Sequence, residues 1–148
     1  MQGVLVLLVL IIIYIGALTF WHCPNMKLTD KNKKDILEKG LIHITSKEKA
    51  QEILETGKFK CKESSFEKSI GKISWFYIAS IREDDYVKMK IVQSKTGKVH
   101  YDKMLLVMNI SEKDMKNMRI RSWFGRDNAV VYIGEYFKPN NIKEVESN

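Results

Sequence analysis

An uninterrupted apolar run near the N-terminus is the strongest constraint on this sequence. Residues 3–21 contain no charged side chain. A helix of this length rises about 1.5 Å per residue and reaches roughly 28 Å, which is about the hydrocarbon thickness of a bilayer. A helix packed on a soluble domain would show a polar face, and this run shows none. We therefore predict a transmembrane helix over residues 1–22, in contact with membrane lipid through residues 3–21.

A cleaved signal peptide is the alternative interpretation of the same run. Signal peptides begin with basic residues and have a shorter apolar core. This chain has no Lys or Arg before its apolar run, and the run is long, so a retained helix is favoured. Lysines follow the run and none precedes it. The positive-inside rule then predicts a single-pass membrane protein whose C-terminal domain is cytoplasmic.

The rest of the chain is long enough for one domain with its own core. We divide it into a basic juxtamembrane linker with a short helix, residues 23–40, and a folded domain, residues 41–148. The 25 Lys and Arg exceed the 18 Asp and Glu, which gives a net charge of +7. That charge is sufficient to attract anionic lipid, nucleic acid or a phosphate-bearing ligand. Because acids are interspersed among the lysines, a solvated basic surface is the simpler explanation.

Cysteine and histidine are too few and too scattered to predict a metal site. Cys23 and Cys61 lie far apart, and none of the three histidines has a cysteine pair nearby. Structural zinc sites need closely spaced ligand pairs. We therefore predict no metal, and for a cytoplasmic domain we expect free thiols rather than a disulfide.

Helix-capping residues predict short helices between the strands. Thr29 is a candidate N-cap for a helix that ends at Gly40. Thr45 and Glu48 have the spacing of a capping box, and the helix they begin ends at Gly57. A third short helix is expected after Ser111, by the same capping rule.

β-branched and aromatic residues predict strands over most of the remaining chain. Alternation over residues 86–93 favours a strand, and Gly97 is suited to close a hairpin with the strand that follows. The predicted strands are residues 41–45, 73–79, 86–93, 99–110, 119–124 and 129–134. The predicted fold class is α+β, a small mixed and mostly antiparallel sheet with two or three helices after the transmembrane helix.

A polar pair in the first predicted strand is the main site candidate. His43 and Thr45 are two residues apart and share one face of the strand, whereas Ile42 and Ile44 point to the other face. The helix that follows presents free backbone N–H groups, which bind polar or anionic ligands. From spacing alone, an exposed or capped histidine on a half-solvated strand is the favoured explanation.

The order of the motifs resembles the ADP-ribosyltransferase-like fold, and most closely its bacterial RNA 2′-phosphotransferases and DNA-targeting ADP-ribosyltransferase toxins. The resemblance covers about residues 41–146. It rests on Leu-Ile-His-Ile-Thr at 41–45, on Ala-x-x-Ile-Leu-x-x-Gly at 50–57, on Ser-Trp-Phe-Tyr-Ile-Ala-Ser at 74–80 and on a closing hairpin with a proline turn at 129–145.

The resemblance implies an NAD-dependent transferase and assigns roles to five residues. His43 would hydrogen-bond the ribose next to nicotinamide, and Thr45 would support the same ribose. Trp75, Phe76 or Tyr77 would line the cleft and stack on the nicotinamide ring. In this family NAD is the cofactor, and the ligand is therefore a nucleotide.

The same resemblance requires a carboxylate, because cleavage of the glycosidic bond develops positive charge on the ribose. The toxin-like members carry an acid in the strand that corresponds to residues 128–134, and this stretch is apolar here. Glu135 is the candidate catalytic acid, since it shares strand parity with Val131 and Ile133. A solvated glutamate at the strand end is the alternative.

The RNA-repair members instead bind phosphate through several arginines, for which Arg82, Arg119, Arg121 and Arg126 are the candidates, with surface charge as the alternative. Two functions are therefore predicted. One is a membrane-anchored transferase of this fold that uses NAD, and the other is a degenerate, non-catalytic, membrane-tethered binding or interaction protein. The sequence does not identify the protein or nucleic-acid target of either predicted function.

Overall fold

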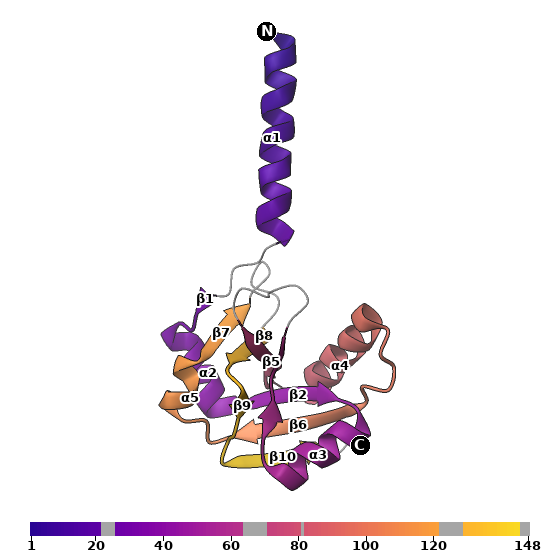
Figure 1. Cartoon of the computed structure of the whole chain (residues 1–148), viewed down its shortest axis with the longest axis vertical. Helices are drawn as coiled ribbons and strands as arrows, with labels where there is room; N and C mark the ends of the chain where they lie inside the picture. The colour runs from indigo at the N-terminus through magenta and orange to yellow at the C-terminus, as the bar shows by residue number, and fades with distance from the viewer. Residues whose placement is uncertain (22–25, 64–70, 81, 122–128, 146–148) are drawn as a thin grey trace.

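A computed structural model describes residues 1–21, 26–63, 71–80, 82–121 and 129–145 (Figure 1). The side chains of residues 16–21 and 82–84 lie outside this description. The elements are α1 (Gln2–Trp21), β1 (Met26–Lys27), α2 (Asp30–Lys39), β2 (Leu41–Thr45), α3 (Lys47–Thr56), β3 (Phe59–Lys60), β4 (Lys62–Glu63), β5 (Lys72–Ile78), α4 (Arg82–Thr96), β6 (Lys103–Met108), α5 (Glu112–Lys116), β7 (Met118–Arg121), β8 (Ala129–Ile133), β9 (Tyr136–Phe137) and β10 (Asn141–Val145).

The N-terminal helix differs from its prediction. Among the described residues, no helix is both long enough and apolar enough to cross a membrane. The predictions of a transmembrane helix over residues 1–22 and of a single-pass membrane protein with a cytoplasmic domain are therefore wrong.

The domain is a mixed α+β fold built on one long sheet. Its strands follow the order β1-β7-β8-β5-β2-β6-β10, with β4 paired to β5, and β3 and β9 form a separate pair. Every described strand pair is antiparallel. β2 lies near the centre, where it pairs with β6 along its whole length and with β5 at Leu41 and Ile42.

The two faces of this sheet carry separate apolar cores. One core contains Leu41 and Phe76 of the sheet, and α2, α3 and α5 contribute to it. The other contains Ile42 and Ile44, which are covered by Met89 of α4. Figure 1 shows α4 set apart from α2 and α5. The alternation of side chains along β2 therefore sends His43 to the first core and its isoleucine neighbours to the second.

α4 is where the structure departs furthest from the strands that the sequence predicted. Residues 86–93 were expected in a strand, and they form the middle of a fifteen-residue helix. The apolar residues of this stretch fit both periods, but only helical spacing places Asp85, Met89 and Val92 on one face, where Met89 becomes buried. Gly97, with φ of 67°, follows the helix end instead of closing a hairpin. Within residues 41–148 the structure thus describes three helices, α3, α4 and α5, of which α4 was not expected.

The helix ends mostly follow their capping residues. Thr29 accepts the backbone N–H of Asn32, and Gly57 adopts the left-handed conformation after α3. The N-cap of α3 is Ser46, whose Oγ accepts the Lys49 N–H at 3.4 Å, and not Thr45. Thr45 cannot leave the sheet because it still pairs with Lys103 of β6.

Candidate functional site

His43 lies in the middle of β2, and its imidazole is held by the protein itself. Nδ1 is 2.7 Å from the carbonyl oxygen of Trp75. Because a carbonyl can only accept, Nδ1 carries the proton in this hydrogen bond. Burial lowers the pKa of His43 below its ordinary value, and the bond to the Trp75 backbone opposes that shift only in part. The ring is therefore neutral at neutral pH.

An aromatic cluster packs against this imidazole, which is half-buried. The His43 ring packs edge-on against Phe59, with centroids 5.1 Å apart, and lies 5.3 Å from Phe76. Phe137 stacks on Phe59 and Tyr132 and meets Phe76 edge-on. Edge-to-face and stacked pairs of this kind add stability beyond the burial of their area. His43 is thus a half-buried polar residue beside a packed aromatic core.

The sheet separates the predicted cofactor-binding residues. Thr45 and Phe76 lie on the same face as His43, and both are buried. Tyr77 packs against the second core, on the opposite face. Trp75 also points away from Phe76 and is 37% exposed, with the guanidinium of Arg121 5.2 Å from its ring centroid. Only Phe76 of the three aromatic residues is therefore brought together with His43.

Glu135, the predicted catalytic acid, lies in the turn between β8 and β9. Its carboxylate is 2.7 Å from the ammonium of Lys72, and this contact raises the pKa of Lys72. Its backbone carbonyl accepts the N–H of Cys61. Lys72 is the first residue of β5, and His43 lies beside Phe76, further along the same strand. At about 3.3 Å per residue, Lys72 and Phe76 are about 13 Å apart along β5. Glu135 is held at the strand end and is not brought to His43.

The predicted phosphate-binding arginines do not form a described cluster. Arg119 donates to the backbone carbonyls of Lys116 and Met118. Arg126 and the side chain of Arg82 lie outside the described residues, as does Cys23. Within the described part of the chain, no group of three or more His, Cys, Asp or Glu side chains is placed to hold a metal ion.

A buried polar cluster that the sequence did not reveal attaches α4 to the end of β5. Asp85 is 7% exposed and accepts the N–H and the hydroxyl of Ser80, at 3.1 Å and 2.9 Å. Lys88 donates to the Ile78 carbonyl and to Ser80 Oγ, both at 2.9 Å, and to Asp85 at 3.2 Å. The i,i+3 spacing of Asp85 and Lys88 would have indicated this pair only once residues 82–96 were recognised as a helix.

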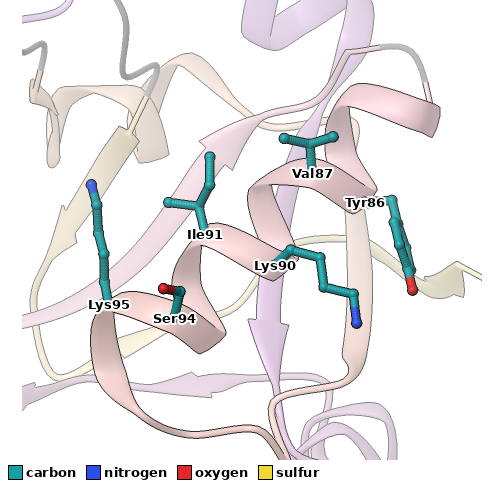
Figure 2. Close-up of a pocket in the computed structure, with 6 residues that line it drawn as sticks. All are labelled: Tyr86, Val87, Lys90, Ile91, Ser94 and Lys95. Carbon is teal, nitrogen blue, oxygen red and sulfur yellow. The ribbon is translucent and has the colours of Figure 1, made fainter.

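The opposite side of α4 is an exposed apolar strip, which we name the outer α4 face. Tyr86, Val87 and Ile91 are 43%, 54% and 43% exposed. Two rows with i,i+4 spacing run side by side along the helix, and Figure 2 shows their side chains pointing outward. The residues that line the shallow hollow between these rows are Tyr86, Val87, Lys90, Ile91, Ser94 and Lys95.

Comparison with known proteins does not assign this chain to a family. No protein-family model matches it, and neither a curated protein nor a solved structure matches it significantly. The description of the chain as an NAD-dependent, ADP-ribosyltransferase-like transferase has no support from any family or relative. NAD binding at His43 stays a prediction.

Proposed function

We propose that this chain is a non-catalytic binding domain whose binding surface is the outer α4 face. The observation that carries the proposal is an exposed strip of three large apolar side chains on a firmly attached helix. Contiguous apolar strips with a polar rim mark interaction sites, whereas scattered exposed apolar residues do not. Asp85 and Lys88 hold the helix in place, so the strip is a preformed surface.

The environment of His43 supports the non-catalytic part of the proposal. Nδ1 is bonded to the Trp75 backbone, and two phenylalanine rings pack against the imidazole. A transferase that cleaves a glycosidic bond needs a carboxylate next to the ribose. Glu135 is paired with Lys72 at the far end of β5 instead.

A display library of random peptides, sorted against the full chain, tests the binding function. Peptides that bind the wild-type chain are sorted again on Ile91→Asp, which places a charge in the strip, and on Val99→Asp, which places one on an exposed residue that does not line the hollow. We expect binders that Ile91→Asp loses and Val99→Asp retains. This comparison also removes peptides that stick to the exposed apolar side chains of α1. If no peptide depends on Ile91, the proposal is wrong.

Thermal unfolding with NAD tests the transferase in parallel. A ligand well above its Kd raises Tm by stabilising only the folded state. We expect no rise for the wild-type chain. A rise that disappears in His43→Phe, a variant that keeps the ring volume, would favour the transferase instead.

A further inference from the structure

We infer that this chain also binds single-stranded nucleic acid, through a basic surface around an exposed tyrosine. The residues of this surface, which we name the lysine–tyrosine patch, are Lys58, Lys60, Lys62, Tyr136 and Lys138. The patch belongs to the first-core side of the molecule, whereas α4 covers the second core. The inference therefore goes beyond the proposed function and does not depend on it.

Alternation along two extended segments places the five side chains on one outer surface. The residues between them, Phe59, Cys61 and Phe137, are buried in the first core, and the patch residues themselves are exposed. Successive side chains of an extended segment point to opposite sides. The buried rings thus fix the β3–β9 pair against the core and turn the lysines and the tyrosine together toward solvent.

Tyr136 is positioned among the lysines as a surface for stacking. Its side chain is 47% exposed, it pairs with Lys60 across the β3–β9 ladder, and the Lys58 ammonium lies 4.7 Å from its ring centroid. Nucleobases stack on exposed aromatic rings, and basic side chains beside the ring contact the nucleic-acid backbone. Binding exchanges a weak, exposed cation–π contact for a stacked base and a phosphate.

The nearest acids do not neutralise the lysines of the patch. None of these four lysines forms an ion pair with an acid of the described residues. Glu52 is bound by Lys49 and Glu135 by Lys72, and Glu63 lies opposite Lys72 in the β4–β5 ladder. Lys49 is the main cause of the lowered pKa of Glu52, to which two patch lysines contribute less. The patch lysines are therefore available to phosphates.

A single strand fits this arrangement better than other anionic partners. The lysines at positions 58, 60 and 62 follow one another at a step of about 6.6 Å along the chain. This step is similar to the distance between successive phosphates of an extended single strand, so neighbouring phosphates can be contacted together. An anionic lipid surface or an acidic peptide would satisfy the lysines but would provide no base to stack on Tyr136.

Fluorescence anisotropy of a labelled oligothymidylate of about twelve nucleotides, titrated with the full chain, tests the charges of the patch. Lys58→Glu should weaken binding about tenfold. Lys98→Glu is the matched control, because Lys98 is also exposed and lies over a tyrosine ring, that of Tyr101, which packs on the second core. It changes the net charge equally and should leave the Kd within about twofold. Lys60→Ala should reduce the slope of log K against log salt by about 0.7.

Two variants of Tyr136 test the stacking in the same titration. Tyr136→Leu removes the ring from an exposed position and should weaken binding about tenfold, whereas Tyr136→Phe keeps the ring and should retain the affinity. Ile91→Asp on the outer α4 face should not change oligonucleotide binding. The two proposed surfaces can therefore fail separately.

Several results would overturn the inference. These are the absence of oligonucleotide binding, an equal loss in Lys58→Glu and Lys98→Glu, which would show attraction by net charge alone, and full affinity in Tyr136→Leu. Sedimentation with vesicles of phosphatidylcholine and phosphatidylserine that Lys60→Glu abolishes, without any oligonucleotide binding, would show a lipid surface instead.

Discussion

On one side of the sheet, the half-buried His43 packs against Phe59 and Phe76, and its Nδ1–H is bonded to a backbone carbonyl. On the other side, α4 turns its polar pair, Asp85 and Lys88, inward and its apolar strip outward. The polar groups on both sides therefore stabilise the fold. The described residues of the two sides differ in what remains accessible, because the α4 side presents an apolar strip with lysines beside it.

Phe76→Ala should have the largest effect on stability, because it removes the ring at the centre of the aromatic cluster. We expect a loss of about 4 kcal/mol in the free energy of unfolding, measured by urea denaturation. Trp75→Ala, one residue away on the opposite face, should cost less, about 2 kcal/mol, since its side chain is 37% exposed and loses partial packing and a cation–π contact with Arg121. Equal losses would mean that the two faces do not differ as described.

Asp85→Ala should have the next largest effect, because it leaves the mostly buried Lys88 ammonium without its carboxylate. Breaking a buried, hydrogen-bonded ion pair costs about 3 kcal/mol. Glu144→Ala, which breaks the exposed pair with Lys103, should cost less than about 1 kcal/mol in the same assay. Hydrogen exchange should also show faster exchange over α4 in Asp85→Ala only. Unchanged exchange would show that the cluster does not fix the helix.

The pH dependence of stability should report the desolvated His43. Because its pKa is lowered in the folded state, the unfolded chain binds a proton first as the pH falls. The free energy of unfolding should therefore be unaffected by His43 above about pH 6.5 and decrease below it, until the pH passes the lowered folded-state pKa. His43→Phe should reduce this slope, whereas His100→Gln, at an exposed histidine, should keep it. Equal slopes in all three proteins would exclude a desolvated imidazole.

These comparisons show which parts of the structure the sequence could predict. Capping residues such as Thr29 and Ser111 act locally, and each caps the helix expected of it. The face shared by His43 and Thr45 followed from the two-residue period of a strand, and the structure keeps them on one face. Such local patterns could not predict contacts between residues far apart in the sequence. The bond from His43 to the Trp75 backbone and the contact of Glu135 with Lys72 depend on strand order and register.

The α4 error has a more specific cause. Tyr86, Val87, Met89 and Ile91 are apolar on both sides of the chain, so neither period excludes the other. The sequence analysis favoured a strand because it weighed only the alternation over residues 86–93. The same apolar residues are the sequence signal of the proposed outer α4 face. A helix with apolar residues on two sides can bury one side against the sheet and present the other to a partner.

Ile91→Asp on α4 should have the smallest effect on stability, in contrast to Met89→Asp on the same helix. Met89 is 4% exposed and Ile91 is 43% exposed, two residues apart. Met89→Asp buries a charge against the second core and should unfold or loosen α4. Ile91→Asp changes an exposed helix position and should alter the free energy of unfolding by less than about 0.5 kcal/mol, while it abolishes peptide binding. If Ile91→Asp destabilised the chain as Met89→Asp does, its outer side would be part of the core. A change in binding would then say nothing about a partner.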